Sequence, residues 1–111
     1  MTKFFTTCLF AFLTFTIFAQ NFTTEGNAIR HTISASVNGE STLYIGELDG
    51  SLSSYSLNGN KLWRVITDNP AVLFEIEAAD VNNDGNDDLV AANANGNIYC
   101  YDSSGKLLWQ F

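Results

Sequence analysis

The chain has 111 residues, of which 46% are hydrophobic, and a formal net charge of −7 from 12 acidic and five basic side chains. This length allows at most one small domain. The acidic balance argues against nucleic acid as a partner, because contacts to phosphate need lysine and arginine side chains.

Residues 1–19 have the layout of a secretory signal peptide. Lys3 precedes an apolar run from Phe4 to Phe18, and the small residue Ala19 follows at the expected cleavage point. The run is shorter than the roughly 20 residues that span a bilayer, so a retained membrane anchor is the weaker alternative. We therefore expect a protein that is secreted or held in the cell envelope. Cleavage would leave 92 residues with a net charge of −8, because Lys3 is lost.

After a short lead-in at residues 20–27, the sequence repeats with an offset of 46 residues. The stretch GSLSSYSLNGNKLW at 50–63 aligns with GNIYCYDSSGKLLW at 96–109. The aligned pairs include Gly50 with Gly96, Leu52 with Ile98, Tyr55 with Tyr101, Gly59 with Gly105, and Trp63 with Trp109. A repeat of this length has the size of one four-stranded propeller blade.

Turn residues divide each copy into four short segments that are expected to be strands. They lie at 28–37, 42–46, 51–57 and 61–66 in the first copy, and at 72–79, 89–92, 96–102 and 106–111 in the second. No sustained helical period is present outside the signal peptide. The predicted fold is all-β, with two four-stranded antiparallel blades, at 28–69 and 70–111, of an incomplete β-propeller.

The stretch DVNNDGNDD at residues 80–88 separates the first two expected strands of the second copy. Calcium prefers six to eight oxygen ligands, and alternate side chains of a tight loop point the same way. Gly85 permits the sharp turn, whereas Asp87 is out of phase and is expected to face water or to bond the turn backbone. The predicted calcium ligands are Asp80, Asn82, Asp84, the backbone carbonyl of Asn86, and Asp88.

A metal-free turn is the alternative for this stretch, because Asp, Asn and Gly favour turns without any ion. The stretch resembles the first half of an EF-hand loop, but Ala91 stands where that loop needs a glutamate. The first copy has no carboxylate at the equivalent positions and is expected to form a plain turn. Those positions are Ser34, Ser36, Asn38, Gly39 and Thr42.

The second copy resembles bacterial propeller repeats of the FG-GAP or VCBS type, in which a DxNxDGxxD loop leads into an apolar strand. Its later half, CYDSSGKLLW, is similar to the tryptophan-docking pattern of pyrroloquinoline-quinone-type propellers, with matches at Asp102, Gly105 and Trp109. The first copy departs from that pattern, because Ser56 stands in place of Asp102. The resemblance covers residues 28–111 and implies neighbouring blades tied by tryptophan, but no particular activity.

Two blades cannot close a ring, since propellers typically have four to eight. We therefore expect further blades as partners. They would come from the same longer chain, of which this sequence is an N-terminal piece or a truncated frame, or from identical chains that form a ring together.

Six other side chains each allow a structural and a chemical interpretation. Trp63 and Trp109 could stack on a sugar, but packing between blades is favoured for repeated tryptophans. Cys100, which would be the lone cysteine after cleavage, is expected to be a buried apolar residue. The same preference for structure holds for three strand residues: His31 is expected near a surface, and Glu75 and Glu77 on one solvated face rather than as a catalytic pair.

These features favour a binding or structural module that uses calcium and recognises a polysaccharide or a cell-surface protein. The main alternative is a fragment of a propeller-type enzyme, such as a polysaccharide lyase or a quinone-dependent dehydrogenase. An enzyme would need a cluster of His, Arg or Lys at the axial face of the propeller. The residues that remain after cleavage of the signal peptide do not supply such a cluster. A scaffold for the assembly of surface proteins is a third hypothesis.

Overall fold

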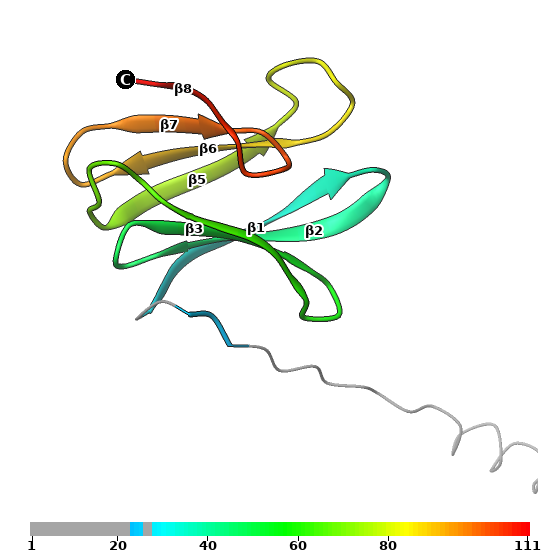
Figure 1. The fold of residues 1–111 in the computed structure, drawn as a ribbon, viewed down its shortest axis with the longest axis horizontal. Coiled ribbons are helices and arrows are strands. Elements are labelled where there is room, and N and C mark those ends of the chain that lie inside the picture. The colour runs from blue at the N-terminus through cyan, green and yellow to red at the C-terminus, as the bar shows by residue number, and fades with distance from the viewer. Residues whose placement is uncertain (1–22, 26–27) are drawn as a thin grey trace, which may run out of the picture.

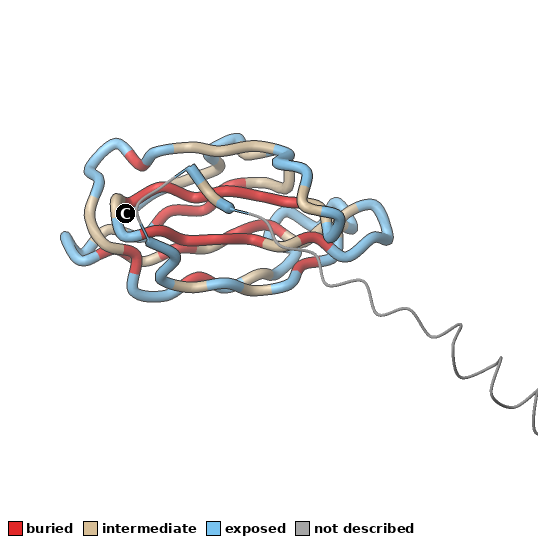
Figure 2. The backbone as a smooth tube through the Cα atoms, turned by 90° about the horizontal axis from the view of Figure 1, so that it is seen from below, coloured by how far each residue is buried: buried red, intermediate tan, exposed pale blue. Residues whose placement is uncertain are grey.

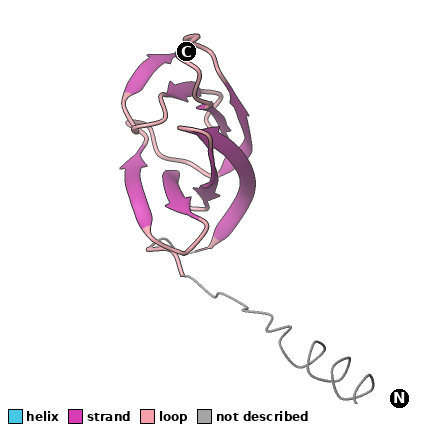
Figure 3. Ribbon diagram, turned by 90° about the vertical axis from the view of Figure 1, so that its right-hand side faces the viewer, coloured by secondary structure: helices cyan, strands magenta, loops and turns pink. Residues whose placement is uncertain are grey.

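The computed structural model describes residues 23–25 and 28–111, which form eight β-strands (Figures 1 and 3). The strands are β1 (Ile29–Val37), β2 (Glu40–Glu47), β3 (Ser51–Ser56), β4 (Lys61–Ile66), β5 (Leu73–Ala79), β6 (Asp88–Asn93), β7 (Ile98–Tyr101) and β8 (Leu107–Gln110). The described part of the chain contains no helix that could span a membrane. The predicted signal peptide lies outside the described residues.

The eight strands form two separate antiparallel sheets, ordered β1-β2-β3-β4 and β5-β6-β7-β8. Each strand pairs with its neighbour in sequence, so each sheet is a meander of hairpins, and the two sheets pack face to face (Figure 1). This confirms the prediction of an all-β fold with two four-stranded antiparallel units. We call the β1–β4 sheet the first blade and the β5–β8 sheet the second blade.

The pairing of the last two strands repeats between the blades. Ser54 pairs with Trp63 in the first blade, and Cys100 pairs with Trp109 in the second. The register then shifts directly after Ser54 and directly after Cys100, which stand 46 residues apart. Such a shift adds local twist to the strand pair. The two copies therefore share the irregularities of their backbone as well as their sequence pattern.

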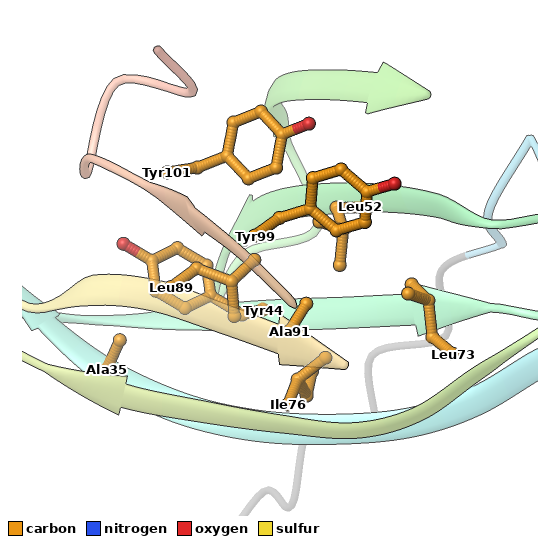
Figure 4. Packing of buried hydrophobic residues seen from close by; sticks show 9 residues of the cluster. All are labelled: Ala35, Tyr44, Leu52, Leu73, Ile76, Leu89, Ala91, Tyr99 and Tyr101. Atoms are coloured by element: carbon orange, nitrogen blue, oxygen red, sulfur yellow. The ribbon is translucent and has the colours of Figure 1, made fainter. Parts of the chain in front are cut away.

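The hydrophobic core lies between the two blades, where the most deeply buried stretches of chain face each other (Figures 2 and 4). Its buried members are Ala35, Tyr44, Leu52, Leu73, Ile76, Leu89, Ala91, Tyr99 and Tyr101. Burial of a leucine or isoleucine contributes about 1.5–3 kcal/mol, so this shared core makes each blade depend on the other. Gly46 allows the close approach, because a Cβ there would lie 3.2 Å from Leu73 and 3.3 Å from Ile76.

Candidate functional site

Residues 80–87 of the acidic stretch form a loop that joins β5 to β6 (drawn in yellow in Figure 1); it is exposed at 80–85 and half-buried at Asn86 and Asp87, and Asp88 begins β6. Both carboxylate oxygens of Asp80 accept backbone hydrogen bonds, from Asp84 N–H at 3.1 Å and from Gly85 N–H at 2.9 Å. Asp88 is fully buried, and its Oδ2 accepts from the N–H groups of Val81 at 2.9 Å and Asn82 at 3.2 Å. Asp88 thus fixes the backbone at the start of the loop, and Asp80 fixes the backbone at its middle.

Shorter hydrogen-bonded turns complete the loop. Asn82 Oδ1 accepts from Asp84 N–H at 3.0 Å, and Asp84 Oδ1 accepts from Asn86 N–H at 2.9 Å. Both are turns in which a side chain bonds the backbone two residues on. Asn83 and Gly85 have positive φ values of 61° and 88°, a conformation that asparagine and glycine tolerate best. The loop is therefore held by its own side chains and backbone.

The predicted calcium ligands are only partly gathered in this loop. Asp80 Oδ1 and Asn82 Oδ1 converge on the same N–H group of Asp84, and Asn82 Nδ2 lies 3.5 Å from Asp88 Oδ1. Over residues 23–25 and 28–111, however, no three His, Cys, Asp or Glu side chains are grouped as a metal site would require. Asn86 was predicted to contribute its backbone carbonyl, and its side chain bonds Asn38 of the first blade.

Asp87 reaches across to the first blade, so the expectation that it faces water or bonds its own turn is wrong. Its N–H donates to Ser36 O at 2.8 Å, and its Oδ2 accepts from Ser36 N–H at 2.6 Å. Beside this pair, Asn86 Oδ1 accepts from Asn38 N–H at 2.7 Å. The physical reason is that β1 is an edge strand whose backbone groups need partners. We call the contacts of Asn86 and Asp87 with the first blade the inter-blade clasp.

Tyr44 adds a buried contact to the inter-blade clasp. Its hydroxyl donates to the backbone carbonyl of Asp87 at 2.7 Å. Burial, followed by the negative charges of Asp88 and Asp87, raises the pKa of the Tyr44 hydroxyl. The hydroxyl therefore keeps its proton at all physiological pH values and remains a donor.

Trp63 forms a second link between the blades, which confirms the packing interpretation for this residue. Its Nε1–H donates to Ser103 O at 2.9 Å, and its ring lies 5.7 Å from that of Tyr44, measured between centroids. A Cβ on Gly105 would lie 2.8 Å from Cδ2 of Trp63, so only glycine leaves room for the indole. Gly105 also has a φ of 87°, which favours glycine. We call this contact the tryptophan seat.

Asp102 shapes the turn that carries the tryptophan seat. Its Oδ1 accepts from the N–H groups of Ser104 and Lys106, both at 2.9 Å. Burial raises the pKa of Asp102, but the hydrogen bonds from Ser104 and Lys106 outweigh it, so the pKa is lower than usual. The carboxylate thus stabilises the turn in its charged form.

Of the remaining side chains, Cys100, Glu75 and Glu77 follow their structural interpretations. His31 lies on β1 and is half-buried, and its Nδ1 accepts from Ile76 N–H at 3.0 Å, so it bridges the blades. Glu75 and Glu77 are exposed. Cys100 is fully buried, and burial raises the pKa of its thiol, which keeps it neutral.

The sequence interpretation missed a charged network at the β2–β3 turn. Glu47 is fully buried and accepts from Ser51 Oγ at 2.5 Å, while Arg64 Nη2 lies 3.7 Å from Glu47 and 3.1 Å from Asp49. The hydrogen bond from Ser51 is the largest cause of the lowered pKa of Asp49. Burial of a glutamate could not be foreseen, because nothing near it in sequence marks Arg64 as its partner.

Comparison with known proteins identifies the family to which the chain belongs. Residues 43–111 match the family described as the lambda-carrageenase β-propeller domain. The chain belongs to this family. Two relatives, the lambda-carrageenases of a Pseudoalteromonas species and of Pseudoalteromonas carrageenovora, are each 37% identical to it over 78 residues. The match covers 68% of this chain and 8% of each relative.

The family assignment confirms the prediction of a β-propeller repeat, and the two sheets are adjacent propeller units. The finer likeness to FG-GAP, VCBS or pyrroloquinoline-quinone-type repeats stays a prediction. The chain spans about 8% of the length of the curated relatives it matches.

Proposed function

We propose that this chain is a structural segment of an exported β-propeller in a polysaccharide-degrading protein. The observation that carries this proposal is the inter-blade clasp, in which Asn86 and Asp87 bind backbone groups of Ser36 and Asn38. The most polar stretch of the sequence is thereby engaged in joining blades. The family of the chain supports the link to polysaccharide, since its matched relatives are named lambda-carrageenases.

The cationic side chains support a structural role over a catalytic one. Of the four lysine and arginine side chains that the structure describes, Arg64 is paired with Glu47 and Asp49 and Lys61 with Glu25, whereas Arg30 and Lys106 are exposed. An anionic polysaccharide would need such cations to be available, and the net charge of −7 would repel it.

A direct test is to incubate the purified chain with neutral and anionic polysaccharides and to measure their molecular mass by size-exclusion chromatography. We expect no decrease in the mass of any polysaccharide and no retardation of the chain in gels that contain the anionic ones. Depolymerisation by this chain alone would contradict the structural role. It would favour the alternative of an enzyme fragment, which the name of the family supports.

We also propose that the loop of residues 80–88 binds calcium weakly. The support is the spacing of the oxygen ligands and the convergence of Asp80 and Asn82 on one N–H group. Each carboxylate oxygen has two lone pairs, so an oxygen that accepts one N–H can still contribute to an ion. Calcium would draw Asp84 and Asp88 toward the same centre and offset their mutual repulsion. A dissociation constant of about 10⁻⁴–10⁻³ M, as in extracellular modules, is expected.

Calcium titration followed by thermal unfolding tests this second proposal. At a calcium concentration 20 times the dissociation constant, mass action stabilises the folded chain by about 1.8 kcal/mol. The gain should disappear in Asp80→Ala and Asp84→Ala and persist in Asp102→Ala, whose carboxylate lies in another turn. Equal stabilisation of all variants, or of none, would leave the loop as a metal-free turn.

A further inference from the structure

His31 on β1 supplies a hydrogen-bond partner to the backbone of β5. These two strands are edges of their sheets, so some of their N–H groups point away from their own ladders and need other partners. The N–H of Ile76 donates to Nδ1 of His31 at 3.0 Å. Because Ile76 is fully buried, its N–H depends on this acceptor. The bond joins the blades near the start of β1, whereas the inter-blade clasp lies at the end of that strand.

A bulge in β1 directs the ring of His31 to the second blade. His31 pairs with Gly46, and a register shift directly before it leaves Arg30 as an extra residue in β1. A bulge of this kind re-aims the side chains next to it. By alternation from the core residue Ala35, the half-buried ring lies on the side of β1 that faces the second blade.

The hydrogen bond to Ile76 requires a neutral imidazole. In the neutral ring one nitrogen donates and the other accepts, whereas both nitrogens donate in the protonated ring. Since Nδ1 of His31 accepts from Ile76 N–H, the proton of the neutral ring is on Nε2. A second proton, taken up from water onto Nδ1, would set one N–H group against another. The hydrogen bond would break and leave the buried N–H of Ile76 without an acceptor.

The ionisable groups of β2 are held away from the ring. Besides His31, the three strands that meet here carry six charged or titratable side chains: Arg30, Glu40, Tyr44, Glu47, Glu75 and Glu77. Glu40 lies at the far end of the β1–β2 hairpin, and the Tyr44 hydroxyl is engaged in the inter-blade clasp. Glu47 is next to Gly46 and so points to the opposite side of β2, where it lies beside Arg64.

The remaining three groups, Arg30, Glu75 and Glu77, are exposed. Glu75 and Glu77 flank Ile76 and, by alternation, point to the side of β5 opposite to the core that Ile76 joins. Water around these carboxylates weakens their attraction for a protonated ring. Within the described residues, His31 forms no ion pair with a carboxylate. The protonated ring is therefore not fixed in its present position by a counter-charge.

We propose that His31 is a pH-operated release for the contact between β1 and β5. With the ring neutral, its Nδ1 bonds Ile76 and fixes the start of β1 to the second blade. When the pH falls and the ring takes up a proton, that bond is lost and the start of β1 comes away from β5. The inter-blade clasp and the tryptophan seat keep the blades together. Histidine is the side chain suited to such a change between about pH 5 and pH 8. This inference goes beyond the proposed structural role and involves neither polysaccharide nor calcium.

NMR of the purified chain, without a histidine tag, tests the proposal between about pH 8 and pH 5. His31 is the only histidine of the sequence, so the nitrogen signals of the imidazole report its tautomer and charge. Hydrogen exchange gives the protection factor of the Ile76 amide, which is corrected for the exchange rate of a free amide at the same pH. We expect Nδ1 to carry no proton in the neutral ring. The protection factor of Ile76 should fall by about tenfold or more as the ring becomes protonated.

Two variants separate the charge of the ring from its shape. His31→Asn places an amide oxygen near the position of Nδ1, and because this acceptor does not titrate, the protection of Ile76 should become independent of pH. His31→Phe keeps a ring without an acceptor and should leave Ile76 weakly protected over the whole range. If His31→Phe fails to fold, the comparison of the unchanged chain with His31→Asn still decides.

Three results would overturn the proposal. One is constant protection of Ile76 while the ring signals show protonation, and another is a ring that stays neutral down to about pH 5. The third is an equal loss of protection in His31→Asn, or in the central strand β3 of the unchanged chain, because the effect would then come from other groups or from unfolding of the whole chain. None of these results depends on the polysaccharide or calcium assays, so a failure of the release and a failure of the proposed function are distinguishable.

Discussion

The two blades use the same nine repeat positions in different ways. Residues 34–42 form the end of β1, a two-residue turn and the start of β2, whereas residues 80–87 leave the ladder and form the acidic loop, after which Asp88 begins β6. The turn in the first blade is Asn38–Gly39, with φ values of 52° and 75°, as expected for a tight hairpin. Asp and Asn side chains that bond nearby backbone compete with strand pairing, which explains why the second copy opens.

The β2–β3 turn and its repeat differ in charge rather than in conformation. Glu47, Asp49 and Ser51 of the first blade correspond to three asparagines of the second. Asn93 holds its turn by accepting from the N–H groups of Asn95 at 3.1 Å and Asn97 at 3.0 Å. The two β2–β3-type turns thus share a backbone conformation, with positive φ at Gly50 and Gly96, although amides of the second blade replace carboxylates of the first. This teaches that the position of acidic residues in one blade does not predict their position in the next.

The largest expected effect separates the two equivalent tryptophans. Trp63→Ala removes an indole packed between the blades and should lower the free energy of unfolding by about 3 kcal/mol. Trp109→Ala, at the repeat-equivalent position on the side of the second blade away from the core, should cost about 1 kcal/mol or less in the same chain. Urea denaturation of both variants measures the difference. Equal losses would mean that the tryptophan seat does not hold the blades together.

The second effect separates the half-buried Asp87 from the exposed Asp84 of the same loop. Asp87→Ala leaves Ser36 N–H without its acceptor and should lower the free energy of unfolding by about 2 kcal/mol. Asp84→Ala removes one acceptor within an exposed turn and should cost about 0.5 kcal/mol. Both are measured by thermal unfolding without calcium, so that ion binding does not contribute. A larger loss for Asp84→Ala would contradict the inter-blade clasp.

The smallest effect concerns the pH dependence of stability that Asp102 contributes. The first blade has Ser56 at the equivalent position of its own turn. Because the folded-state pKa of Asp102 is lowered, its charged form stabilises the fold above the unfolded-state pKa of about 3.9. That stability, about 1 kcal/mol, is lost as the pH falls through the folded-state pKa. Between pH 6 and pH 2, the free energy of unfolding should therefore decrease less with falling pH for Asp102→Asn than for the unchanged chain. Ser56→Ala is the control and should keep the original slope.

The fold was largely predictable from the sequence, because the 46-residue repeat and the turn residues report local structure. The predicted strand at 61–66 matches β4, and the others differ by a few residues at their ends. Asp87 was misjudged because its partner, Ser36, is 51 residues away and belongs to the other blade. Ligand spacing describes one loop at a time and contains no information about a neighbouring sheet.

The central claim is that the acidic loop of the second blade supplies hydrogen-bond partners to the backbone of β1 and of the turn after it, at the edge of the first blade. Hydrogen exchange at the backbone amides of Ser36 and Asn38, followed by NMR, tests it most directly, because these amides donate to Asp87 and Asn86. We predict that both are protected in the unchanged chain and that Asp87→Ala releases Ser36 while the amides of β3 stay protected. Exchange of Ser36 and Asn38 at the rates of unprotected amides in the unchanged chain would contradict the account.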